Sequence, residues 1–101
     1  MANSVIKKET EKIIFRGTLG GSVMNVVRNC PVGITFYRNS NSPAGAPDGI
    51  GYGAYIIIKP GTDGISIMCI ANMTSAKGFA CAYEINESLT DQELSTRWAQ
   101  I

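Results

Sequence analysis

The sequence contains no histidine and few charged residues. Asp, Glu, Lys and Arg make up 17% of its 101 residues, against about 25% in an average soluble domain. Without histidine, Ser-His-Asp and Cys-His catalysis are excluded, as are zinc sites with imidazole ligands. The carboxylates Asp48 and Asp63 lie in Gly/Pro-rich turns, and Asp91 and Glu93 lie in a helix-capping pattern. We therefore expect a protein that is not an enzyme and that uses no cofactor and no metal.

Basic residues are also sparse, and they are scattered. The net charge is +1, and Lys7 and Lys8 form the one adjacent basic pair. Proteins that bind nucleic acid usually carry a basic stripe, so we expect no nucleic-acid partner. The apolar run 54–58 is far shorter than a membrane span, and the start of the chain has no apolar stretch typical of a signal peptide. Membrane insertion is therefore not expected.

The chain has three cysteines, Cys30, Cys69 and Cys81, and no C-x-x-C motif. An odd number of cysteines does not form a disulfide framework. Cys69 and Cys81 fall in neighbouring predicted strands and could face each other, but buried reduced thiols are the favoured interpretation. Reduced thiols are typical of proteins made in a reducing cytoplasm, such as that of bacteria.

The shortage of charge has a consequence for assembly. A small domain has much surface for its volume, so it should carry more charge than average. We expect that part of the surface contacts other protein, because exposed apolar area on a lone monomer is a liability. The alternative is an uncharged polar surface rich in Gly, Ser, Asn and Thr.

The apolar fraction of 45% and the length of 101 residues predict one folded domain. The polar residues 1–10 are expected to be a linker or the stub of a shaft, followed by a single β-rich domain at 11–101. Apolar runs bounded by Gly, Pro and Asn predict strands at 11–19, 34–39, 52–59, 65–71 and 78–85. Strand 52–59 is apolar on both faces, so we expect it at the centre of the sheet with cover on both sides.

Two segments between these strands have their own signals. Ser22 precedes valines at helical spacing, which predicts a short helix over 23–29. Residues 40–51 contain two prolines, three glycines and an Asp-Gly pair. That composition predicts an exposed loop without regular structure.

The C-terminal stretch allows two interpretations. Thr90 and Glu93 fit a capping box, which predicts a helix over 89–97. Alternatively, 95–101 forms a closing edge strand, which we favour because the preceding strands need an outer partner and Trp98 would cover them. The expected fold class is therefore mainly β: a small antiparallel sheet of about five to six strands with one short helix.

Aromatic residues are the remaining candidates for a binding site. Aromatic rings stack on the C–H faces of sugars, while amide and guanidinium groups hydrogen-bond to the hydroxyls. The candidate binding residues, at the two ends of the long loop and near the C-terminus, are Tyr37, Arg38, Asn39, Asn41, Tyr52 and Trp98. The alternative is that these rings pack in the core or between subunits, where Tyr and Trp are enriched.

The order of motifs from about residue 22 to 101 is Pro31-x-Gly33, Gly49-x-Gly51-Tyr52-Gly53, a long aliphatic strand, Pro60-Gly61, two further strands and a terminal Trp98-x-x-Ile101. This order resembles the C-terminal knob, or receptor-binding region, of bacteriophage tail fibres and the related pyocin fibres. The chain departs from that pattern at Met68-Cys69-Ile70, where Gln-x-Tyr or Gln-x-Phe is usual, and at Tyr83-Glu84-Ile85, where Tyr-x-Arg is usual. The acidic insert 87–93 is also longer than the typical Gly-rich turn.

The resemblance implies a homotrimeric knob on a virion tail. It implies attachment to a bacterial surface glycan or protein as the function, with no catalysis. The alternative is a structural protein of the virion or tail, or a trimerisation domain, that has no receptor site of its own.

Overall fold

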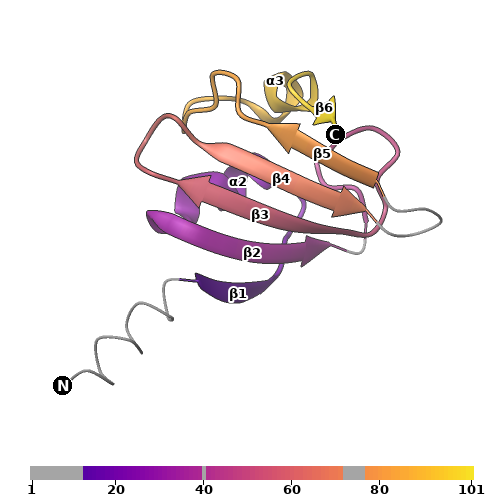
Figure 1. The fold of residues 1–101 in the computed structure, drawn as a ribbon, viewed down its shortest axis with the longest axis horizontal. Coiled ribbons are helices and arrows are strands. Elements are labelled where there is room, and N and C mark those ends of the chain that lie inside the picture. Colours follow the sequence, from indigo (N-terminus) through magenta and orange to yellow (C-terminus); the bar gives the residue numbers. More distant parts are fainter. Residues whose placement is uncertain (1–12, 40, 72–76) are drawn as a thin grey trace.

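The computed structural model describes residues 13–39, 41–71 and 77–101, with side chains from residue 17 onward. The predicted linker at 1–10 and most of the predicted turn at 72–77 lie outside this part. The described chain is mainly β, with one six-stranded sheet in the order β1-β2-β3-β4-β5-β6 and two short helices (Figure 1). The elements are β1 (Ile13–Thr18), α2 (Val23–Asn29), β2 (Gly33–Asn39), β3 (Gly53–Lys59), β4 (Ser66–Ala71), β5 (Lys77–Cys81), α3 (Asp91–Ser95) and β6 (Ala99–Gln100).

The sheet is mixed, so the prediction of an antiparallel sheet is wrong at one edge. β1 pairs with β2 in parallel, with Ile13 beside Ile34 and Phe15 beside Phe36. Parallel pairing follows from the helix between the two strands, because a strand–helix–strand crossover returns the chain in the same direction. All other neighbouring strands pair antiparallel.

The C-terminal stretch contains both predicted elements, a helix followed by a closing edge strand, and each is shorter than the range predicted for it. Thr90 accepts a hydrogen bond from Glu93 N (3.1 Å), and the Glu93 carboxylate accepts one from Thr90 N (3.1 Å). This capping box starts α3, the second helix of a fold for which one was expected. The strand that remains, β6, has two residues on the edge of β5.

The predicted strand at 78–85 ends earlier than expected, at Cys81. Beyond it, Glu84 adopts a positive φ of 53°, which a regular strand does not allow. Tyr83 and Ile85 therefore lie in the connection to α3.

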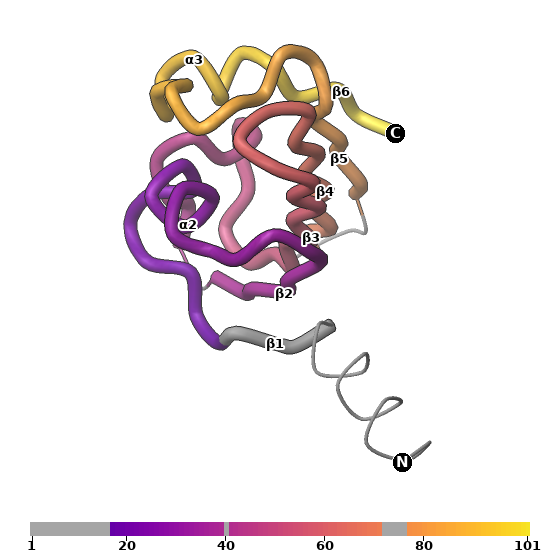
Figure 2. The backbone as a smooth tube through the Cα atoms, turned by 90° about the vertical axis from the view of Figure 1, so that its left-hand side faces the viewer, coloured from indigo at the N-terminus to yellow at the C-terminus, as the bar shows by residue number. Residues whose placement is uncertain are grey.

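One face of the sheet is covered by α2, the loop after β2 and the C-terminal segment (Figure 2). The core lies between these layers. Its fully buried large side chains include Met24, Tyr55, Ile57, Ile65, Ile67, Ile85 and Leu94. The loop is part of this covering layer, because Ala46 and Ile50 are buried. The expectation that residues 40–51 form an exposed loop was wrong for these positions: the loop lacks regular structure but packs on the core.

Charged side chains from distant parts of the chain hold both ends of α2. At its N-terminus, the Asp91 carboxylate accepts hydrogen bonds from Ser22 Oγ and from Met24 N (2.9 Å). At its C-terminus, the buried Lys59 ammonium donates to carbonyl oxygens of the last turn and lies 2.6 Å from Glu87. These contacts satisfy backbone groups that every helix end leaves unpaired.

The three cysteines are buried and free, as predicted. Burial raises the pKa of the Cys69 thiol and raises that of Cys81 to about 11, with nearby Arg97 partly opposing the shift at Cys81. In the unfolded chain a thiol titrates near 8.5. Above that pH the unfolded state has lost protons that the folded state still holds, so stability falls as the pH rises.

We therefore expect the free energy of unfolding to decrease between pH 8 and pH 10, by at most about 1.4 kcal/mol per pH unit for each thiol. Urea unfolding at several pH values measures this slope. In Cys81→Ala the slope should be smaller than in the parent chain, even though the cavity lowers stability at every pH. Equal slopes for the two proteins would contradict the assignment.

Candidate functional site

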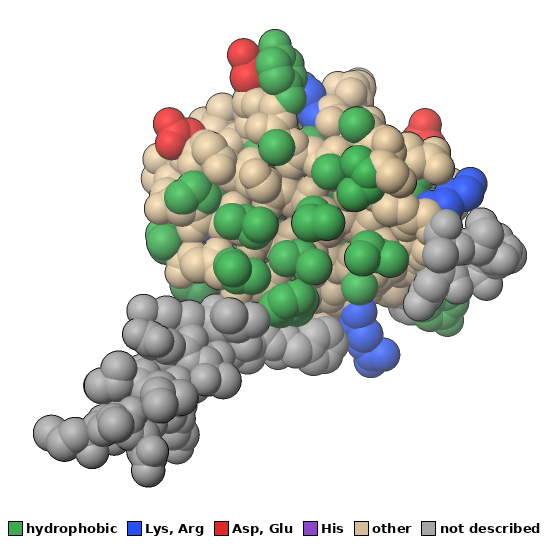
Figure 3. Space-filling view, viewed as in Figure 1, with side chains coloured by type: hydrophobic (Ala, Val, Ile, Leu, Met, Phe, Trp, Pro, Cys, Tyr) green, Lys and Arg blue, Asp and Glu red, His purple; other side chains and the backbone are tan. Residues whose placement is uncertain are grey.

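The second face of the sheet has no covering layer from the described chain. The strand register places three rows of side chains on it: Ile34, Ile58 and Ser66; Phe36, Ile56, Met68 and Ala80; and Arg38, Ala54, Ile70 and Gly78. We call these eleven residues the open face. Ile58 and Ile70 remain 39% and 46% exposed, although they are large and aliphatic. Figure 3 shows hydrophobic side chains grouped over the middle of this side of the sheet.

β3 shows how one-sided the fold is. Its residues alternate, with Tyr55, Ile57 and Lys59 buried on one side and Ala54 and Ile58 exposed on the other. The prediction that this strand is central is confirmed, since it is third of six. The described residues cover one of its faces, so the predicted cover on the second face does not come from them.

The open face is nearly free of charge. Arg38 is its one charged member, and it stands in the row at one end of the strands. Association of such a surface with another apolar surface requires little desolvation of charge, whereas a charged partner would find few groups to pair with.

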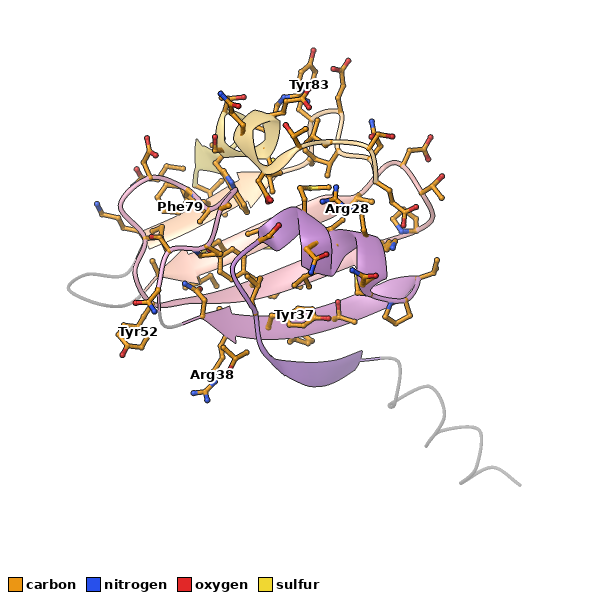
Figure 4. The ribbon with its side chains drawn as sticks, turned by 180° about the vertical axis from the view of Figure 1, so that it is seen from behind. Arg28, Tyr37, Arg38, Tyr52, Phe79 and Tyr83 are labelled. Atoms are coloured by element: carbon orange, nitrogen blue, oxygen red, sulfur yellow. The ribbon has the colours of Figure 1, made fainter. Side chains whose placement is uncertain are left out.

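The predicted binding residues divide between the two sides of the sheet (Figure 4). Arg38 and Tyr52 are exposed, and the register places them at the same end of the sheet, where Arg38 pairs with Ala54. Tyr37 alternates to the covered side and packs against the core. The structure therefore brings Arg38 and Tyr52 to one end and separates Tyr37 from them.

Asn39 lies in the fold rather than on the surface. It is 4% exposed, and its amide nitrogen donates to Asn41 O and to Gly51 O (2.6 Å). These bonds join the start and the end of the long loop. Asn39 and the exposed Asn41 also line a small pocket of about 190 Å³ next to Gly20. The Asn39 side chain thus holds the loop in shape, and Asn41 remains at the surface.

Trp98 also makes its contacts within the fold. Its indole N–H donates to Gly45 O (2.7 Å), and its ring meets Tyr55 edge to face with 6.4 Å between centroids. Both contacts lie on the covered side of the sheet. Trp98 therefore joins the C-terminal segment to the loop and the core, away from exposed Arg38.

A wider groove lies beside α3. It has a volume of about 630 Å³ and includes Asp63, Glu84, Glu93 and Arg97 in its lining. Hydrogen bonds from the backbone and side chain of Thr90 lower the pKa of the Glu93 carboxyl, and Arg97 donates to Tyr83 O (2.8 Å). The polar groups of this groove thus make local contacts that hold the connection before α3.

The open face is the feature that sequence reasoning did not place. The signal was present, because strand 52–59 is apolar at successive positions and so supplies apolar side chains to both faces. This pattern predicts cover on both sides of the strand but does not say which part of the protein, or which further subunit, supplies it. Alternation identifies residues that share a face but not the layer that covers them.

Within the described residues, no group of three or more His, Cys, Asp or Glu side chains is placed to hold a metal ion. None of the described helices is long and apolar enough to cross a membrane. Comparisons of the chain with protein-family models, with curated proteins and with solved structures found no match.

Proposed function

We propose that this chain is a non-catalytic attachment module of the phage or prophage tail-fibre type, which acts as a homotrimer and binds a bacterial surface receptor such as a glycan. The observation that carries the proposal is the one-sided sheet. The fold has a core on one side and an almost uncharged apolar face on the other, so it is suited to work in contact with further protein.

Of the predicted receptor-site residues, Arg38, Tyr52 and Asn41 stay exposed, and the end of the sheet with Arg38 and Tyr52 is the proposed contact. Tyr52 is 50% exposed and offers a ring for stacking, and Arg38 offers guanidinium donors for hydroxyl or carboxylate groups. A single contact of this size is weak. Display of three copies on one fibre would raise the overall affinity through avidity.

The second candidate function is assembly without a receptor site. It is favoured by the placement of Asn39 and Trp98, whose polar groups bond the loop rather than face the solvent. In this case the chain would trimerise or join other tail components, and the exposed Tyr52 would have no ligand.

Binding to a panel of bacterial cells and to a glycan array separates the two candidates. We expect the parent protein to bind and Tyr52→Ala to bind at least about fivefold less, since the loss of an aromatic anchor can cost more than about 1 kcal/mol. The matched control is Tyr83→Ala. It removes a tyrosine that is 68% exposed and that follows β5, at the end of the sheet opposite Tyr52.

Equal loss in Tyr52→Ala and Tyr83→Ala would contradict the proposed receptor end. A trimer that binds neither cells nor glycans would favour the assembly function. A chain that stays monomeric at all concentrations would contradict the trimeric attachment module and the trimerisation form of the assembly function.

A further inference from the structure

We propose that the small pocket beside Asn41 binds one neutral sugar unit of a longer surface glycan. The proposal rests on the proposed attachment function and names the chemical class of its receptor. The pocket lies between residues 19–21, which follow β1, and residues 39–43, at the end of the sheet that carries Arg38 and Tyr52.

The two walls of this pocket are tied to each other by backbone hydrogen bonds. Leu19 N donates to Arg38 O (2.6 Å), and Ala44 N donates to Gly21 O (2.9 Å). These bonds lie on either side of the pocket along the chain, so its shape is set by the fold. A ligand would therefore enter a preformed site and would have to order little of the chain.

Gly20 and Gly21 keep one wall of the pocket free of side chains, and the fold requires neither glycine. A Cβ atom added at either position would meet no atom within 4 Å, and neither residue has a φ in the left-handed region. At Gly45, in contrast, a Cβ atom would lie 2.6 Å from the Asp91 carboxylate. Because neither packing nor backbone conformation accounts for Gly20 and Gly21, the consequence of the missing side chains is an open pocket in which a ligand can approach the backbone closely.

The polar groups of the pocket are suited to hydroxyl groups. Asn41 and Ser42 are exposed, and their side chains make no hydrogen bond within the described part of the chain. An amide and a hydroxyl each donate and accept hydrogen bonds, as sugar hydroxyls do. Buried Leu19 and Pro43 add apolar surface for the C–H groups of a sugar ring.

Charge and size narrow the ligand further. The residues that line the pocket are uncharged, so they offer no counter-charge to a carboxylate, a phosphate or an ammonium group. The volume of about 190 Å³ is below the roughly 300–1,000 Å³ of sites that enclose a whole small molecule. The pocket therefore takes one uncharged unit, and the next unit of the glycan would reach Tyr52. Asn39 connects the two contacts, because its amide donates to the carbonyl of Gly51, next to Tyr52.

Amide NMR spectra of the full chain test the pocket residue by residue. Methyl glycosides of neutral hexoses and of N-acetylhexosamines should shift the resonances of Gly20, Gly21 and Ser42. The resonance of Gly61, in the turn at the opposite end of the sheet, should stay in place. The methyl glycoside of glucuronic acid should bind at least about tenfold more weakly than the neutral sugars, because its carboxylate finds no counter-charge.

Substitutions in the pocket give the second readout, on an array of neutral and acidic oligosaccharides. Asn41→Ala/Ser42→Ala removes the polar groups and should weaken binding to neutral glycans at least about tenfold. Gly21→Val narrows the pocket and should do the same. Gly61→Val is the matched control, because a Cβ atom at Gly61 also meets no atom within 4 Å. Thermal unfolding confirms that each variant folds, and the alanine pair decides the question if Gly21→Val does not.

The outcomes separate the pocket from the function. Unchanged binding of neutral glycans by the alanine pair, or resonance shifts away from the pocket, would overturn the assigned site and leave the proposed function standing. Binding to acidic glycans alone, or to cells but to no glycan, would overturn the neutral-sugar ligand and would also leave attachment standing. A parent chain that binds neither cells nor glycans would overturn both this inference and the receptor-binding function.

Discussion

Lys59→Met should destabilise the fold by about 3–5 kcal/mol, the largest effect we expect from a single substitution. The Lys59 side chain is 6% exposed, and its ammonium donates to Val27 O (2.8 Å), Arg28 O (3.3 Å) and Cys30 O (2.9 Å). Methionine keeps most of the volume but donates no hydrogen bond. The carbonyls at the end of α2 would then lose their ammonium donor, with Val27 O keeping only the weak Cys30 Sγ donor (3.5 Å), and Glu87 would lose its counter-charge.

Urea denaturation at one fixed protein concentration measures this loss, since association also changes apparent stability. Lys77→Met is the matched control, because Lys77 is an exposed strand lysine and its removal should cost less than about 0.5 kcal/mol. Glu87→Gln should fall between the two, since it removes the ion pair and leaves the carbonyl bonds in place. Similar losses in Lys59→Met and Lys77→Met would contradict the structural role of the buried ammonium.

Trp98→Ala should destabilise by about 2–4 kcal/mol, below the usual cost for a fully buried Trp because this ring is half-buried. The substitution removes the edge-to-face contact with Tyr55 and the hydrogen bond to Gly45 O. We expect hydrogen exchange to quicken in the loop around Gly45 and in β6, since Trp98 connects them. A scan of thermal unfolding should show the loss as a lower midpoint.

Trp98→Phe separates the two contributions. It keeps an aromatic ring against Tyr55 but removes the N–H donor, so it should cost about 1 kcal/mol plus a small packing loss. Tyr83→Ala, at an exposed ring, serves as the control and should change stability little. If Trp98→Ala were no more destabilising than Tyr83→Ala, the C-terminal segment would not be held in the way the structure indicates.

Local signals accounted for most of the secondary structure. Ser22 accepts from Asn25 N (3.0 Å) at the start of α2, and the Thr90–Glu93 capping box starts α3. The residues that form such caps are close together in the sequence, so the caps can be identified without knowledge of the fold. The error at the C-terminus came from treating the helix and the strand as alternatives, whereas the chain contains both in succession.

The parallel pairing of β1 could also have been predicted. A strand at 13–18, a helix at 23–29 and a strand at 33–39 form a crossover unit, which implies parallel strands once all three elements are accepted. The roles of Asn39, Lys59 and Trp98 could not have been predicted in the same way. Apart from Asn41, which is next but one to Asn39, the hydrogen-bond partners of these side chains lie 12 to 53 residues away in the chain.

By itself, the amino-acid sequence determined the β class, the approximate positions of β1 to β4, the caps of both helices and the low charge of the surface. Tertiary structure decided which apolar face of the sheet is covered, and hence which face stays open. The physical reason is that alternation along a strand is a local property, whereas cover comes from α2, the long loop and the C-terminal segment packing together on one side. Because of the same packing, the side chains of Asn39 and Trp98, two of the predicted binding residues, hydrogen-bond to the backbone of the long loop instead.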